Sequence, residues 1–229
     1  MIPQMIPFVL KEGLYDPGIF KAFFLAGGPG SGKTYVTTRV TGGMGLKNVN
    51  SDRAFEVGLK KAGLSLKMPD AEAKQRDPIR VRAKELTGKA LENYIQGRLG
   101  LVVDSTGRDY DSIARPVMLL KQMGYDCYMI FVNTSLDVAL ERNRRRERTV
   151  PEYITRNSWT KVQSNIGRFQ NLFGMENMII VDNSKDDREL TTVVMSKVDK
   201  NVRRLLRNKV KSYTAKRWMA SERKARRRW

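Results

Sequence analysis

Short apolar runs alternate along the chain with longer segments in which apolar residues recur at helical spacing. The runs predict strands over residues 20–26, 46–50, 100–104, 127–132 and 177–182. The longer segments predict helices over residues 32–40, 53–63, 80–97, 111–123, 135–147, 152–172 and 188–212. Strands that alternate with helices form βαβ units, so this order predicts an α/β fold with a parallel sheet of about five strands sandwiched by helices.

The same pattern divides the chain into a core and two extensions. We expect the α/β domain over residues 20–185, an N-terminal extension over 1–19 and a helical C-terminal extension over 186–229. A chain of 229 residues with 41% hydrophobic content can bury one such core. Residues 64–79, which contain two prolines, predict a loop or lid where an acceptor substrate would enter.

Composition narrows the function classes. The chain has no histidine, which excludes zinc sites that use histidine and catalytic triads built on it. Its only cysteine, Cys127, lies in an apolar run and is expected to be buried. No apolar run approaches the length of a membrane helix and the first residues lack a signal pattern, so we expect a cytoplasmic protein that does not enter the membrane.

The net charge of +19 is concentrated at the C-terminus. Residues 200–229 hold 13 Lys and Arg and one Glu, so +12 of the charge lies there. The segment begins as an amphipathic helix, and we expect the last ~15 residues to be mobile, as free termini commonly are. Basic clusters interleaved with Tyr213, Trp218 and Trp229 favour nucleic acid as a partner. A solvated tail, or contact with an acidic protein or a membrane, is the alternative.

The most specific motif is G-x-x-x-x-G-K-T over residues 27–34, placed between a predicted strand and a predicted helix. Its glycines let backbone N–H groups surround phosphate oxygens, and the helix N-terminus adds positive potential. Lysine in this motif reaches the β- and γ-phosphates, and the threonine hydroxyl ligates Mg²⁺. The motif therefore predicts ATP and Mg²⁺ as cofactors, with these nucleotide-binding residues: Gly28, Pro29, Gly30, Ser31, Gly32, Lys33 and Thr34. A dinucleotide site is disfavoured because the glycines do not fit G-x-G-x-x-G.

Two aspartates follow predicted strands, where ligands gather in a parallel sheet. Asp52 is placed to accept a proton from an acceptor hydroxyl, or else caps the following helix, a role that Ser51 could fill equally well. Asp104 ends an apolar strand as a Mg²⁺-holding carboxylate does, or else it serves a turn. Ser105 stands where motor ATPases carry a water-activating glutamate, so the pattern favours a transferase.

Arginines supply candidate ligands for anionic groups. Thr106 and Arg108 follow the third strand and could bind an anionic acceptor, although Arg108 could equally be a solvated charge. Arg142 and Arg146 are four residues apart in a predicted helix, so both guanidinium groups are expected to face the same phosphates. There they would stabilise the transferring phosphoryl group. A helix surface that binds nucleic acid is the alternative.

Taken together, these motifs resemble two kinase families. The P-loop, Asn50-x-Asp52 and Arg142-Asn143-x-x-Arg146 followed by Val150-Pro151 are similar to the kinase domain of phage polynucleotide 5′-kinases. Residues 104–108, with the Leu-Lys-x-x-Gly-Tyr run at 120–125, resemble the zeta-toxin kinases. The resemblance covers roughly residues 20–185 and implies a P-loop kinase core.

The resemblance also implies roles for individual residues. Asp52 would be the general base, Lys33 and Thr34 would bind ATP and Mg²⁺, and Arg142 or Arg146 would be the lid arginine. Two positions depart from the families: Phe55 stands where polynucleotide kinases carry arginine, and Asp104 stands where zeta toxins carry glutamate.

These features lead to one expected function and two alternatives. We expect transfer of the γ-phosphoryl group of ATP to a nucleic-acid 5′-hydroxyl, in host cytoplasm if the chain is of phage origin. A kinase of a sugar nucleotide such as UDP-N-acetylglucosamine is the first alternative. A nucleic-acid-binding protein that uses ATP without transferring phosphate is the second.

Overall fold

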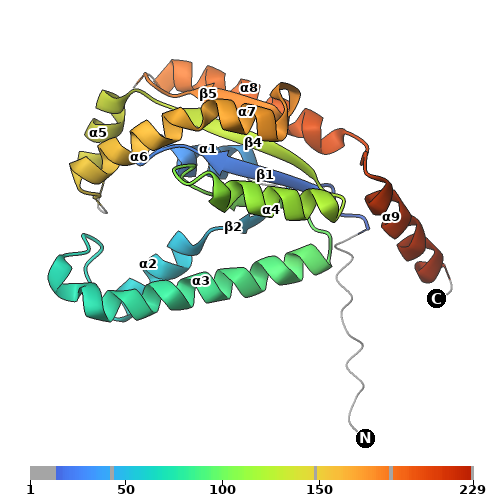
Figure 1. Ribbon diagram of the computed structural model, residues 1–229, viewed down its shortest axis with the longest axis horizontal. Helices are drawn as coiled ribbons and strands as arrows, with labels where there is room; N and C mark the ends of the chain where they lie inside the picture. Colours follow the sequence, from blue (N-terminus) through green and yellow to red (C-terminus); the bar gives the residue numbers. More distant parts are fainter. Residues whose placement is uncertain (1–13, 42–43, 147–148, 186–187, 228–229) are drawn as a thin grey trace, which may run out of the picture.

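The computed structural model describes residues 14–41, 44–146, 149–185 and 188–227 (Figure 1). Its strands are β1 (Lys21–Ala26), β2 (Lys47–Val49), β3 (Leu101–Asp104), β4 (Asp126–Asn133) and β5 (Met178–Asp182). Its α-helices are α1 (Lys33–Thr41), α2 (Ser51–Lys61), α3 (Ala73–Gln96), α4 (Asp111–Gln122), α5 (Leu136–Arg144), α6 (Glu152–Ser164), α7 (Ile166–Phe173), α8 (Arg188–Arg207) and α9 (Tyr213–Arg226). Short 3₁₀ turns lie at η1 (Asp70–Glu72) and η2 (Met175–Asn177).

The five strands form one parallel sheet in the order β2-β3-β1-β4-β5. The α/β prediction is thereby confirmed, with each strand within about two residues of its predicted bounds. Because β1 is central, the loop that follows it lies in the middle of the carboxyl edge of the sheet. In the open sheets of α/β proteins, ligands bind at this edge.

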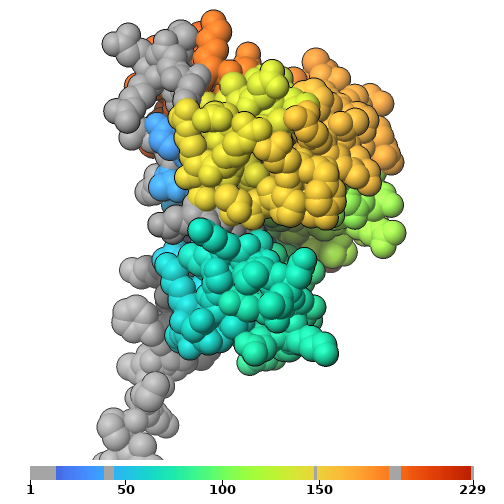
Figure 2. All heavy atoms as spheres, turned by 90° about the vertical axis from the view of Figure 1, so that its left-hand side faces the viewer, coloured from blue at the N-terminus to red at the C-terminus, as the bar shows by residue number. Residues whose placement is uncertain are grey.

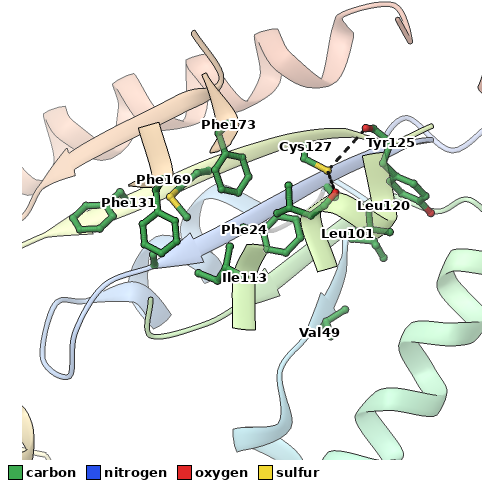
Figure 3. Packing of buried hydrophobic residues seen from close by; sticks show 14 of the residues in the cluster. Phe24, Val49, Leu101, Ile113, Leu120, Tyr125, Cys127, Phe131, Phe169 and Phe173 are labelled. Atoms are coloured by element: carbon green, nitrogen blue, oxygen red, sulfur yellow. Dashed lines mark hydrogen bonds between the residues drawn. The ribbon is translucent and has the colours of Figure 1, made fainter. Parts of the chain in front are cut away.

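Side chains alternate between the two faces of the sheet, and helices cover both. On one face, Phe24 packs with apolar residues of α4, α6 and α7, including Phe169 and Phe173 (Figure 3). On the other, Phe23 and Leu25 pack against α1 and α8. Cover on both faces explains why the central strands are almost continuously apolar. Cys127 is buried in this core, as expected, and burial raises the pKa of its thiol to about 12.

Helices α2 and α3 form a hairpin beneath the sheet, with a small core of its own at Phe55, Leu59 and Ala83 (Figure 1). The prediction of an irregular segment over 64–79 is wrong for its second half, because α3 begins at Ala73 and continues through Pro78. Proline lacks one backbone donor and disfavours a helix interior, but Pro78 lies near the start of α3. The loop expected there is confined to the residues before η1.

The C-terminal extension is helical, as predicted, but its helices have other bounds than the sequence indicated. The helix expected over 188–212 ends at Arg207, and a further helix, α9, follows. Within α9, Ala215 is fully buried and the Trp218 ring meets the Phe20 ring edge-on at 5.5 Å. The prediction that the last ~15 residues are mobile is therefore wrong for those that belong to α9, up to Arg226, while Trp229 lies outside the described residues. Of the helices in the described part of the chain, none is both long and apolar enough to cross a membrane.

Candidate active site

The phosphate-binding loop leaves β1 at Ala26 and ends where α1 begins. Gly30 and Gly32 have φ values of 78° and 91°, a region that L-residues with side chains rarely adopt. A Cβ at Gly30 would lie 2.2 Å from the Ala139 carbonyl oxygen, and one at Gly32 would lie 2.4 Å from the Asn183 amide nitrogen. Asn183 in turn donates to the Ser31 carbonyl at 2.8 Å. The loop is thus fitted between α5 and the end of β5, with no room for larger residues.

Lys33, the first residue of α1, folds back over this loop. Its ammonium group donates to the Gly27 carbonyl and, at 3.4 Å, to that of Gly28. Burial lowers the pKa of Lys33, Asp104 opposes this shift, and Arg146 adds to it. The Thr34 side chain beside it is exposed. Lys33 therefore occupies a concave loop of carbonyls and amides, where the phosphates of a nucleotide would exchange with its carbonyl partners.

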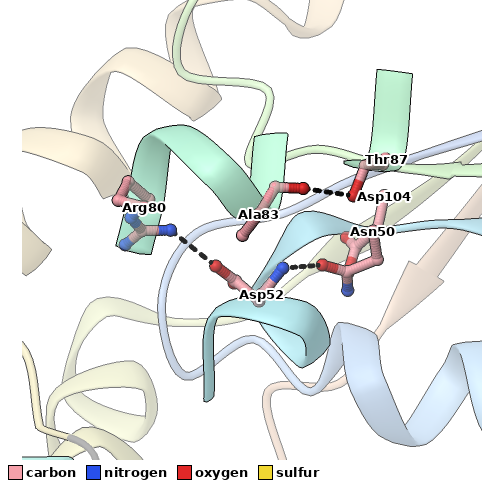
Figure 4. A network of polar contacts seen from close by, with 6 residues as sticks. All are labelled: Asn50, Asp52, Arg80, Ala83, Thr87 and Asp104. Carbon is pink, nitrogen blue, oxygen red and sulfur yellow. Dashed lines mark hydrogen bonds and ion pairs between the residues drawn. The ribbon is translucent and has the colours of Figure 1, made fainter. Parts of the chain in front are cut away.

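Three polar residues meet where β2 passes into α2 and where β3 ends: Asn50, Asp52 and Asp104 (Figure 4). The charges of Asp104 and Asp52 both act on Lys33. Asn50 caps α2: its side-chain oxygen accepts from the Asp52 backbone N–H at 2.7 Å. The Asn50 amide also donates to Asp104 Oδ2 at 2.7 Å. Because Asn50 is the cap, the Asp52 carboxylate is not needed for that purpose and extends from the first turn of α2 toward α3.

Asp104 fits the role of a cation ligand. Burial raises the pKa of Asp104, while Lys33 opposes the shift and Asp52 adds to it. Its Oδ1 atom is buried and has no hydrogen-bond partner, an arrangement that is costly unless a ligand completes it. No cluster of three candidate metal ligands occurs among the described residues. One carboxylate together with the Thr34 hydroxyl and nucleotide phosphates suits Mg²⁺, which takes few ligands from proteins and keeps several waters.

Arg80 of α3 is a site residue that the sequence prediction missed. Its guanidinium group donates to Asp52 Oδ1 at 2.9 Å and lies 3.9 Å from the centre of the Phe55 ring. Phe55 is fully buried, whereas Arg80 and Asp52 are partly exposed. A cation stacked on an aromatic ring keeps one face free for further contacts. Arg80 thus places a guanidinium beside Asp52 from a helix other than the one that carries Asp52.

The structure does not bring Arg142 and Arg146 to one helical face. Helix α5 ends at Arg144, so Arg146 lies beyond it. Arg142 donates to the carbonyls of Asn183 at 2.9 Å and Lys185 at 3.2 Å. Arg146 is exposed and lies close enough to Lys33 to lower the pKa of that group. The prediction of a shared face is wrong because the helix ends early. Arg142 binds the segment after β5, and Arg146 is the arginine whose charge reaches Lys33.

The loop after β3 lies beside the phosphate-binding loop. The Gly27 backbone N–H donates to the Thr106 carbonyl at 3.0 Å. Asn165 immediately precedes α7, and its side-chain amide donates to the carbonyls of Gly107 and Arg108 at 3.0 and 3.1 Å. The side chains of Thr106 and Arg108 are exposed. Both residues therefore stand near the site on a braced backbone, with side chains available to an incoming molecule.

The α2–α3 hairpin and the segment of α5 and α6 face each other across a hollow. In Figure 2 the cyan and green-blue atoms of α2 and α3 lie below the yellow atoms of α5 and α6. A hollow of about 330 Å³ lies between them, lined by Lys67 and Met68 on one side and by Asn143, Arg144 and Val150 on the other. Asn143 and Val150 exchange two hydrogen bonds, of 2.6 and 3.1 Å, which close the base of the α5–α6 connection.

Comparisons with known proteins agree with this geometry. The model of a family described as AAA domain matches residues 23–169. No curated protein matches the chain significantly. Among solved structures, a gluconokinase from Sinorhizobium meliloti 1021 is 14% identical, with a TM-score of 0.50, covering 82% of this chain and 94% of that one.

Two further structures have the same fold. A putative kinase from Chloroflexus aurantiacus is 19% identical, with a TM-score of 0.53, over 79% of this chain and 97% of that one. A structure of the PezAT toxin-antitoxin system of Streptococcus pneumoniae is 15% identical, with a TM-score of 0.52, over 81% of this chain and 87% of that one. These likenesses show a common fold; the residues that hold an acceptor have to be argued from this chain.

Proposed function

The chain belongs to the AAA domain family and has the fold of a P-loop kinase, and we propose that this phosphotransferase moves the γ-phosphoryl group of ATP to the 5′-hydroxyl of a nucleic acid. The observation that carries the acceptor assignment is the contact between Asp52 and Arg80. It places a proton acceptor and an anion-binding group side by side, at the edge of the sheet that holds the phosphate-binding loop.

The nucleotide side of the proposal uses the loop and its neighbours. Backbone N–H groups over residues 30–34 would surround the phosphates, and Lys33 would pair with their oxygens in place of its loop carbonyls. Thr34 and Asp104 would hold Mg²⁺, which supplies charge neutralisation on the phosphates when it is bound. Arg146 is placed to add a second positive charge near the transferring group.

The acceptor side uses Asp52 as the base. The acceptor oxygen forms a bond to the γ-phosphorus, the bond between that phosphorus and the bridging oxygen of ADP breaks, and the hydroxyl proton passes to the Asp52 carboxylate. Asp52 can do this because its backbone is fixed by the Asn50 cap while its side chain is about half exposed.

Arg80 supports a nucleic-acid acceptor. The 5′-terminal nucleotide of a strand carries a phosphate on its 3′ side, and a guanidinium binds phosphate oxygens in a two-pronged geometry. The Arg80 group is held on the Phe55 ring, which leaves its remaining donors free to bind such a phosphate while the hydroxyl meets Asp52. An acceptor such as gluconate offers a single carboxylate and no phosphate for Arg80 to bind. Asp52 and Arg80 could, however, bind a sugar nucleotide through its diphosphate in the same way.

The test is transfer of label from γ-labelled ATP, with Mg²⁺, to a panel of acceptors. The panel contains 5′-hydroxyl DNA and RNA oligonucleotides, nucleosides, gluconate and UDP-N-acetylglucosamine, and Lys33→Ala is the control. Label on oligonucleotides that disappears with Lys33→Ala supports the proposal. Label confined to the sugar nucleotide or to gluconate reassigns the acceptor, and ATP binding without label on any acceptor indicates a nucleotide-dependent binding protein.

A second comparison tests the role of Arg80 within this site. Arg80→Lys keeps the charge but loses the planar two-pronged donor, so the KM for an oligonucleotide should rise more than the KM for a nucleoside, which has no phosphate for Arg80 to bind. Equal changes for both acceptors would show that Arg80 only positions Asp52.

A further inference from the structure

Helix α9, the last helix of the basic C-terminal extension, lies at the opposite edge of the sheet from the phosphate-binding loop. Strand β1 runs from Lys21, beside α9, to Ala26, where that loop begins (Figure 1). At about 3.3 Å per residue, the strand separates the two regions by roughly 17 Å. The charge of α9 is therefore not part of the active site, and its purpose has to be sought where it lies.

Helix α9 is held rigidly on the body of the protein. A methyl group at Gly124 would lie 3.0 Å from the Ala215 backbone nitrogen, which shows how closely the helix approaches the turn before β4. Trp218 packs on Phe20, and the Arg98 guanidinium lies 5.9 Å from the Trp218 ring. This packing buries the apolar side of α9, so the helix has no apolar face left to insert into a membrane.

Three cations from this region border one hollow of about 380 Å³. Lys209, from the α8–α9 connection, and Lys216 and Arg223, from α9, line it together with Lys21 and Met219. The Lys21 ammonium is already neutralised by Asp126 at 2.6 Å. Within the part of the chain that the structure describes, no carboxylate pairs with Lys209, Lys216 or Arg223. All three are exposed.

The spacing of these cations suits a repeating polyanion. Lys216 and Arg223 are seven residues apart, about two helical turns and 10 Å along α9. Two cations at this separation can each contact a different phosphate of the same backbone. Tyr213, at the start of the same helix, is 77% exposed and offers a ring on which a base can stack.

We propose that Lys209, Lys216 and Arg223 form a second binding surface, which holds the phosphate backbone of a nucleic acid at the edge of the sheet remote from the active site. It contributes affinity through phosphate contacts and does not read sequence. The proposal does not depend on which acceptor the active site phosphorylates.

The test measures binding without any possibility of phosphate transfer. A single-stranded DNA of about 30 nucleotides, labelled at its 3′ end and already phosphorylated at its 5′ end, is titrated with full-length protein at salt concentrations from about 50 to 200 mM. Fluorescence anisotropy then compares the wild type, the triple variant K209Q/K216Q/R223Q and the control K84Q/K89Q/R115Q. The control removes the same charge from exposed positions on α3 and α4.

The triple variant should bind at least about tenfold more weakly, and the slope of log affinity against log salt should become shallower by about 2, since each single-strand phosphate contact contributes about 0.7. The control should stay within about twofold of the wild type. Equal losses in both variants, no loss in the triple variant, or no binding by the wild type would overturn the proposal. The proposal would also be overturned if polyglutamate bound as tightly as the DNA and lost as much affinity in the triple variant. That result would assign the surface to an acidic protein. Because the probe cannot accept phosphate, each of these outcomes leaves the assignment of the acceptor untouched.

Discussion

Replacing Asp52 with Asn separates catalysis from stability more cleanly than any other change in the site. The substitution keeps the shape of the side chain and leaves intact the hydrogen bond from the backbone N–H of residue 52 to the Asn50 side-chain oxygen. It removes the ion pair with Arg80, in which the Arg80 side chain is 33% exposed and the Asp52 side chain 48% exposed. A pair this open to solvent is worth about 0–1 kcal/mol, so the melting temperature should fall by no more than about 4 °C.

The chemical step should respond much more strongly. A positioned general base contributes about 10²–10⁴-fold, which corresponds to roughly 2.7–5.4 kcal/mol in the barrier. We therefore expect kcat to fall by at least about a hundredfold, while the Kd for ATP is unchanged because Asp52 lies on the acceptor side. Initial rates of label transfer and calorimetric titration with ATP measure the two quantities.

The matched control is Asp77→Asn, which removes the same charge from an exposed position on α3. It should leave both quantities unchanged. A kcat for Asp52→Asn within about threefold of the wild type would refute the argument, since this is far below what a general base contributes.

Three further predictions concern burial and space. Burial raises the pKa of Asp104 above its ordinary value of 3.8. The ionised carboxylate therefore lowers the free energy of unfolding at pH values above the raised pKa. Asp104→Asn should raise the melting temperature of the nucleotide-free protein at pH 7, and this gain should vanish below pH 3.8. Cys127 should resist iodoacetamide at pH 8 until guanidinium unfolds the protein, since its thiol is buried with a pKa of about 12. Gly32→Ala should weaken ATP binding at least about tenfold by calorimetry, because its Cβ would lie 2.4 Å from the Asn183 amide. Gly45 has a φ of 74° and no atom within 4 Å of an added Cβ, so Gly45→Ala should leave ATP binding unchanged. Equal losses of ATP affinity in the two variants would show that backbone strain, and not the clash with Asn183, causes the effect.

The features that local chemistry determines could be predicted from the sequence. The glycines and Lys33 identify the phosphate-binding loop because few other structures need that spacing, and strands buried on both faces stand out as continuous apolar runs. The early end of α5 could not be predicted, because Arg145 and Arg146 are compatible with a helix and the end depends on the pairing of Asn143 with Val150.

Contacts between distant segments account for the other differences. Arg80 reaches Asp52 from 28 residues away, and the contact exists only because α2 and α3 fold back on one another. Helix α3 includes Pro78, although the loop predicted over residues 64–79 placed this proline outside any helix. The sequence predicts a helical C-terminal extension, but the burial of Ala215 and the contact of Trp218 with Phe20 depend on segments that are distant in the sequence. In both cases tertiary contacts decide what the local pattern leaves open.

The α2–α3 hairpin has a hydrophobic core separate from the two that hold the sheet, built on Phe55, Leu59 and Ala83. Substitutions around these three positions therefore leave the packing that shapes the phosphate-binding loop in place, whereas Leu91, Tyr94 and Ile95, farther along α3, pack against the core of the sheet. Such a division makes the part of the hairpin around Asp52 and Arg80 exchangeable: selection, or an engineer, can replace the residues that meet the acceptor while the nucleotide-binding residues stay as they are. A kinase built in this way can acquire a new substrate without being rebuilt.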